Sequence, residues 1–128
     1  FVVSRDASAA EPDQPESRVE ALAEGVFELV TEHEPVFRAL HAAAIAGDAA
    51  ALDRRRIAWA EEALAPLRGR LSPGAFDGLV RAVTVYLGVE SVLVLRDVCG
   101  LPPGIARSIT GWAARAMVRA AEEEAGLR

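Results

Sequence analysis

The chain has 128 residues, of which 52% are apolar and only 5% aromatic, and its formal net charge is −5. A chain of this length and composition can bury a sizeable core, which excludes disorder over most of it. The acidic balance excludes nucleic-acid binding through its own surface, because neutralising phosphates requires a basic patch. Ala, Leu and Val dominate the apolar residues, so we predict an all-α fold.

The arginines give little information about binding partners, whereas the single cysteine indicates the cellular compartment. All 14 basic residues are Arg, and they are scattered among acids, which fits coding bias better than anion recognition. Because Cys99 has no second cysteine to pair with, we expect a cytoplasmic protein. The first residues lack the pattern of a signal peptide, and four charges interrupt the apolar run at 79–98, so we predict no membrane span.

The first predicted helix follows a tail or linker over residues 1–13, which are polar and show no period. Asp13 can cap this helix, Pro15 fits its first turn, and it is predicted to end near His33. One face of it is apolar at helical spacing and is predicted to be buried: Val19, Leu22, Ala23, Val26, Phe27 and Val30.

Two further helices are predicted before residue 70. Pro35 opens a short helix over about Pro35–Ala46, whose buried side should carry Phe37, Leu40, His41 and Ala44. After the stop at Gly47, a third helix is predicted from Ala49 to about Arg68. Its inward residues are predicted to be Leu52, Ile57, Trp59, Ala60, Ala63 and Leu64.

A long central helix is predicted from Pro73 to Val98, with Ser72 as its cap. Its run at 79–98 is apolar nearly all round, so it must be covered on several sides. One stripe is small and suits close helix packing: Thr84, Gly88 and Ser91, continued by Leu95. The opposite face carries Tyr86 and Glu90.

The last predicted helix begins at Pro103, after a stop at Gly100, and extends to about Glu124. It carries a continuous apolar seam with small residues at its centre: Ile105, Ile109, Trp112, Ala113, Ala116, Met117 and Ala120. Both small-residue surfaces indicate association of two copies, and the alternative is that both pack within one chain.

The end of the chain resembles the C-terminal half of TetR/AcrR-family transcriptional regulators. The matching stretches are ESVLVLRDVCGL from Glu90 to Leu101, a proline-containing turn, and GWAARAMVRAA from Gly111 to Ala121. The order and lengths of the predicted helices extend the likeness to about residues 16–124. The resemblance is one of pattern more than of motif, because the effector domains of this family carry no catalytic signature.

This resemblance implies a five-helix effector-binding and dimerisation domain over residues 14–124, whose last two long helices form a four-helix bundle with a second copy. DNA would be bound only through a helix-turn-helix domain, for which the residues before Val19 are too few. The chain would then be a fragment, the ordered part of a longer protein, or a regulator without its DNA reader. The expected homodimer interface contains Thr84, Gly88, Ser91, Leu95, Ile105, Ile109, Trp112, Ala113, Ala116, Met117 and Ala120.

A small apolar or amphipathic effector is expected to bind between the first four helices. The predicted lining is Phe27, Val30, Phe37, Leu40, His41, Trp59, Val83, Tyr86, Leu87 and Glu90. His41, Tyr86 and Glu90 are the candidate polar contacts. A buried carboxylate must be paired or protonated, so Glu90 either meets a cationic ligand or pairs with an Arg. Cys99 is interpreted as a small apolar filler rather than a redox sensor.

No pattern in the sequence indicates catalysis, a metal or a cofactor. His33 and His41 are separated by a proline break, and no HExxH motif, phosphate loop or serine nucleophile elbow is present. We therefore expect that the protein is not an enzyme. We predict that it is the ligand-sensing and dimerisation domain of a transcriptional regulator, and that this regulator is a repressor. The alternative is a helical protein–protein interaction module without a ligand.

Overall fold

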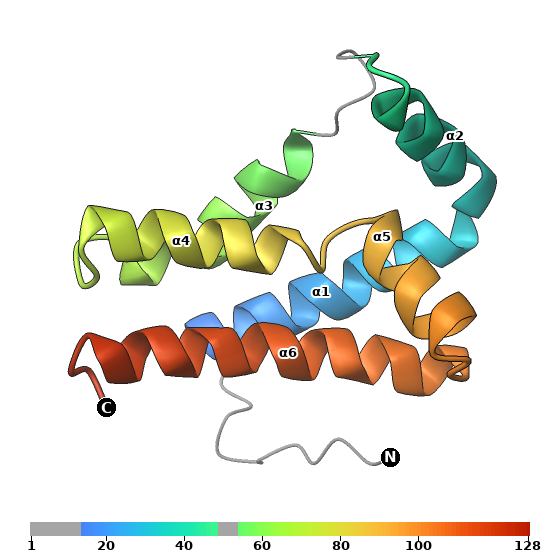
Figure 1. Cartoon of the computed structure of the whole chain (residues 1–128). Coiled ribbons are helices and arrows are strands. Elements are labelled where there is room, and N and C mark those ends of the chain that lie inside the picture. Colours follow the sequence, from blue (N-terminus) through green and yellow to red (C-terminus); the bar gives the residue numbers. More distant parts are fainter. Residues whose placement is uncertain (1–13, 49–53) are drawn as a thin grey trace.

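The computed structural model describes residues 14–48 and 54–128, and within these ranges the chain forms six α-helices and no strand (Figure 1). The all-α prediction is therefore confirmed. The elements are α1 (Pro15–Glu32), α2 (Glu34–Ile45), α3 (Arg55–Ala63), the 3-10 turn η3 (Ala65–Leu67), α4 (Pro73–Thr84), α5 (Val89–Val92), the π-helical segment η4 (Leu93–Val98) and α6 (Pro103–Glu124).

The prolines mark where four of these helices begin, as the sequence predicts. A proline occupies one of the first two positions of α1, α2, α4 and α6, where its fixed φ suits the helix and its missing N–H costs no hydrogen bond. Ser72 caps α4, because its hydroxyl accepts a hydrogen bond of 3.2 Å from the Ala75 N–H. The predicted cap Asp13 lies outside the described residues.

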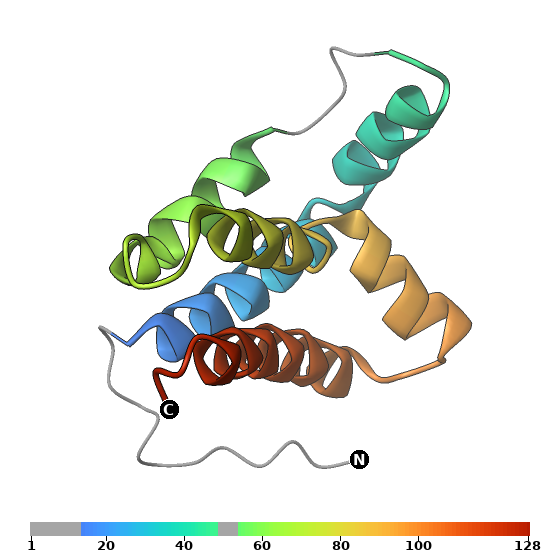
Figure 2. The same ribbon diagram turned by 60° about the vertical axis from the view of Figure 1, so that its left-hand side comes forward.

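Four helices form the body of the molecule. In both views α1 and α6 lie side by side and antiparallel, with α4 packed along α6 and α3 against α1 and α4 (Figures 1 and 2). The core between them is aliphatic, and its largest fully buried apolar side chains are Val19, Val30, Leu64, Leu67, Val83, Leu87, Val92 and Val118. Gly111 allows close approach of α1 and α6, since a Cβ there would lie 3.0 Å from Glu20 and Glu24 carbons.

The prediction of one long central helix from Pro73 to Val98 is wrong. The helix ends at Thr84, residues 85–88 form turns, and a second helical piece begins at Val89 at an angle of 53° to the first. Gly88 in the break is fully extended, with φ −165° and ψ −172°. Within the described ranges no single helix is long and apolar enough to cross a membrane, and only these two bent pieces together would qualify by length and composition.

The second piece is wider than an α-helix over most of its length. Between Leu93 and Val98 it is π-helical, and the Cys99 N–H donates to the Val94 carbonyl at 2.9 Å, five residues back. The predicted third helix is also shorter than expected. Residues 49–53, including the predicted inward Leu52, lie outside the described ranges, and the α-helix ends at Ala63, before the 3-10 turn that contains Pro66.

Helix α2 rises away from the body of the molecule in both views (Figures 1 and 2). None of its 12 residues is buried, so the predicted burial of Phe37, Leu40, His41 and Ala44 is wrong in degree: these side chains are half-buried. Within the described residues, α2 packs mainly against α5 and the end of α1.

Candidate functional site

The break between α4 and α5 is occupied by a charged side chain from α3. Arg56 reaches over Gly88, and a Cβ on that glycine would lie 2.3 Å from Arg56 Nη1. The same nitrogen donates a hydrogen bond of 2.8 Å to Glu90 Oε2. A side chain at this position would therefore displace the Arg56 guanidinium, and the backbone of Gly88 is extended rather than left-handed.

In the structure Glu90 is paired with an arginine, which is one of the two interpretations made from the sequence. The carboxylate pairs with Arg56, and both side chains are partly accessible, at 38% and 25% exposure. The pair could not be predicted from the sequence, because Arg56 and Glu90 are 34 residues apart and meet only when α3 packs beside the break. An effector that uses the Glu90 carboxylate would have to displace or share Arg56.

A second charged site, which the sequence analysis missed, joins the start of α2 to η4. Arg96 contacts the Glu34 carboxylate with both terminal nitrogens, Arg38 donates to Glu34 at 2.7 Å, and Arg38 also reaches Asp97 at 3.1 Å. Arg96 Nε closes the ring by donating to Asp97 at 2.9 Å. We refer to Glu34, Arg38, Arg96 and Asp97 as the charge cluster.

The charge cluster shifts the titration of its own members. Hydrogen bonds from Arg96 and then Arg38 lower the pKa of Glu34 from 4.5 to about 2. The same neighbours, with Arg96 first, lower the pKa of Asp97, and Glu34 and Asp97 raise the pKa of Arg96. Glu34, Arg96 and Asp97 are therefore charged at neutral pH. The i, i+4 spacing of Glu34 and Arg38 was visible in the sequence, but their partners on η4 were not.

The residues predicted to line an effector pocket fall into three groups. Phe27, Val30, Val83 and Leu87 are buried in the core and leave no free surface. Phe37, Leu40 and His41 lie half-buried on α2, and Tyr86 and Glu90 lie half-buried in or beside the break. Trp59 is separate from both sets.

Trp59 lies in a groove of about 450 Å³ between α1 and α3, lined with Arg18, Leu22 and Glu62 among others. None of the other predicted pocket residues lines this groove. A smaller groove of about 300 Å³ lies between α3 and α4, beside Ile57 and Thr84.

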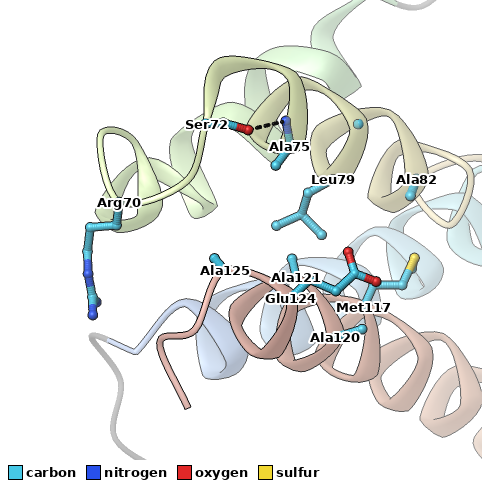
Figure 3. Close-up of a pocket in the computed structure, with 11 residues that line it drawn as sticks. Arg70, Ser72, Ala75, Leu79, Ala82, Met117, Ala120, Ala121, Glu124 and Ala125 are labelled. Atoms are coloured by element: carbon cyan, nitrogen blue, oxygen red, sulfur yellow. Dashed lines mark hydrogen bonds between the residues drawn. The ribbon is translucent and has the colours of Figure 1, made fainter.

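A wider groove of about 690 Å³ separates the C-terminal half of α6 from α4 (Figure 3). Leu79 points between the two helices, toward Ala121 and Ala125 (Figure 3). Most of the lining is small and apolar, with polar groups contributed by Arg70, Ser72 and Glu124. Two predicted interface residues, Met117 and Ala120, also line this groove.

The residues predicted to form a dimer interface divide between two places. Thr84 ends α4, Gly88 is buried in the break and Ser91 is buried beyond it, so these three do not form the continuous stripe that a single helix would give. Their hydroxyl groups bond within the chain, Thr84 to the Val80 carbonyl and Ser91 to the Gly88 carbonyl. Leu95 lies half-buried on η4.

The predicted seam on α6 faces away from the chain's own core. The buried side of α6 is formed by Ala106, Thr110, Ala114, Val118 and their neighbours. Most of the seam lies on the opposite side of the same helix, whereas Met117 lies at the border and packs against the core. Trp112 is 47% exposed, Ala120 is exposed, and the others are half-buried: Ile105, Ile109, Ala113, Ala116 and Met117. We call these seven residues the α6 outer face.

The interpretation of Cys99 as an apolar filler is wrong, because Cys99 is exposed at the end of η4. Among the described residues no group of three or more His, Cys, Asp or Glu side chains could hold a metal ion. Comparisons of the chain with known protein families, curated proteins and solved structures gave no match.

Proposed function

We propose that this chain is the small-molecule-sensing and dimerisation domain of a DNA-binding transcriptional repressor, built on the plan that its resemblance to the TetR/AcrR family implies. DNA would be contacted through a helix-turn-helix domain outside the 128 residues. The observation that carries the proposal is the α6 outer face, a row of apolar side chains along 16 residues of a long helix, on which Trp112 is 47% exposed and Ala120 is exposed.

An apolar helix face of this kind favours association with a second copy. Its centre is small, at Ala113, Ala116 and Ala120, which lets a second helix approach closely, and Trp112 and Ile109 supply larger apolar area. The groove between α4 and α6 continues this surface through Met117 and Ala120. An isologous dimer would bring the α6 outer faces of two copies together.

The sensing part of the proposal is supported by α2. This helix presents Phe37, Leu40 and His41 toward the molecule without burying any of them, which leaves apolar side chains partly open next to polar groups. Half-buried apolar residues with a few polar neighbours are the usual surroundings of a small amphipathic ligand. Tyr86 and the Arg56–Glu90 pair supply polar groups on the break segment.

Dimerisation is tested by placing a charge at the centre of the α6 outer face. Light scattering after size exclusion should give the mass of two chains for the unmodified protein and of one chain for Ala116→Glu, because burying an unpaired carboxylate costs several kcal/mol. Ile45→Glu is the matched control, since Ile45 is 73% exposed on a different helix. A monomer at micromolar concentration for the unmodified protein, or an Ala116→Glu dimer, would count against the proposal.

Sensing is tested with three amphipathic aromatic dyes, one cationic, one neutral and one anionic, by calorimetry and thermal melting. We expect one of them to bind with one site per chain, and Leu40→Gln to weaken that binding. Ile45→Gln should leave it unchanged, because Ile45 lies on the same helix but points to solvent. A dimer that binds none of the three dyes would favour the second candidate, a helical interaction module, which the same α6 outer face supports.

A further inference from the structure

Helix α2 has few apolar contacts with the rest of the chain. It packs mainly on α5 and on the end of α1, from which only His33 separates it. Two of its larger side chains, Val36 and Ile45, are 59% and 73% exposed. The hydrophobic contribution to its position is therefore small for a helix of 12 residues.

Ion pairs connect α2, which has no fully buried residue, to η4. The charge cluster alternates in sign around a ring, with Glu34 and Arg38 on α2 and Arg96 and Asp97 on η4. Two of its contacts cross between the elements, from Arg96 to Glu34 and from Arg38 to Asp97. The first of these is the more shielded, since the side chains of Arg96 and Glu34 are 27% and 23% exposed.

We propose that the charge cluster is a latch that holds α2 against η4, and that α2 opens as a lid when the latch is broken. Opening would pivot at His33, whose carbonyl accepts from the Val36 and Phe37 N–H groups at the start of α2. The charge pairs hold the first turns of α2, while none of its side chains is fully buried and Phe37 is only partly buried against the core. Local opening of this kind needs little free energy when few apolar contacts are lost.

The latch has a consequence for the proposed function. Of the residues that the sensing proposal assigns to the effector, Phe37 lies between the two latch residues of α2, and Leu40 and His41 follow them. Opening would expose them, so the charge cluster would control entry of the effector. This consequence rests on the sensing proposal, whereas the latch itself can be tested without any ligand.

The test is amide hydrogen exchange on the whole chain, comparing α2 with α1 and α6. Arg96→Gln/Asp97→Asn removes both crossing contacts and leaves the sequence of α2 unchanged, so its intrinsic helix propensity does not change. Glu34→Gln/Arg38→Gln removes the same contacts from the other side and leaves η4 unchanged. Each double variant should speed exchange in α2 on the order of fivefold, the size expected for losing a small network of partly exposed ion pairs, with α1 and α6 unaffected.

Glu61→Gln is the matched control, because it breaks the exposed Arg68–Glu61 pair, which does not involve α2. In the unmodified protein, raising salt from about 0.1 to about 1 M should also speed exchange in α2, since it shortens the Debye length from about 10 to about 3 Å. Unchanged exchange in α2 for both double variants would overturn the latch. Faster exchange in all helices together would also overturn it, because the cluster would then stabilise the whole fold.

Discussion

Gly88 lies under the Arg56 guanidinium, and this contact gives a sharp prediction at the scale of single residues. Gly88→Ala should lower the free energy of unfolding by about 1 kcal/mol, because the new Cβ would push Arg56 away from Glu90 and break a partly exposed ion pair. The φ of −165° suits alanine, so no backbone strain is added. Urea unfolding followed by circular dichroism measures the change.

The control for this prediction is the same substitution in an Arg56→Met background. There the ion pair is already absent, so Gly88→Ala should cost little. If Gly88→Ala lowers the free energy of unfolding equally in both backgrounds, the glycine is needed for its backbone conformation and not for the approach of Arg56.

At the scale of elements, the attachment of α2 to η4 should depend on pH. The pKa of Glu34 is lowered from 4.5 to about 2 in the folded chain, so its stabilising contribution is fully present above pH 4.5 and is lost as the pH falls toward 2. The protection of α2 amides against hydrogen exchange, corrected for the intrinsic exchange rate at each pH, should therefore differ between the unmodified chain and Arg96→Gln/Asp97→Asn at pH 7 and converge between pH 4.5 and 2. A difference that stayed constant over this range would show that Glu34 is not the titrating partner.

The starts of the helices could be predicted from the sequence, and the break in the central helix could not. Pro15, Pro35, Pro73 and Pro103 act locally, through a fixed φ and a missing N–H, so they mark the same places in the sequence and in the fold. The break at residues 85–88 contains no proline. It is stabilised by the contact of Arg56 with Glu90. These two residues are 34 apart in the sequence, so no local sequence pattern indicates the contact.

The candidate site shows the same contrast between features set by local sequence and features set by contacts between distant residues. The outward position of Trp112 and Ala116 follows from helical periodicity alone, and the structure places both away from the core. The charge cluster joins residues 62 apart, and the half-burial of Phe37 reflects how α2 packs against α5 and the end of α1. Neither can be inferred without the arrangement of the helices.

At the scale of the whole molecule, α1 and α6 are joined at one end through Arg128. Its guanidinium contacts Glu16 in the first turn of α1 and lies 3.1 Å from a Glu122 carboxylate oxygen on α6. Both glutamates are largely buried, and burial raises the pKa of Glu122. Arg128 therefore bridges two largely buried carboxylates, and Arg70 and Arg119 also lower the pKa of Glu122 by their charge.

Arg128→Met should lower the free energy of unfolding by about 2 to 3 kcal/mol at pH 7, because it leaves buried charge uncompensated. The loss should shrink at acidic pH, since protonation removes the charge from the carboxylates. Adding Glu122→Gln should recover part of the stability, and guanidinium unfolding of the three variants measures it. Equal loss at pH 7 and at acidic pH would mean that Arg128 acts through packing rather than charge.

The exposed Cys99 is a natural site for attaching a spectroscopic label. It is the only cysteine in the sequence, it lies in solvent at the end of η4, and it follows Asp97 by two residues. A thiol-reactive fluorophore can therefore be attached to the unmodified chain at one known point beside the charge cluster. Its emission and anisotropy would report when α2 departs from η4, in real time and with no substitution anywhere in the protein.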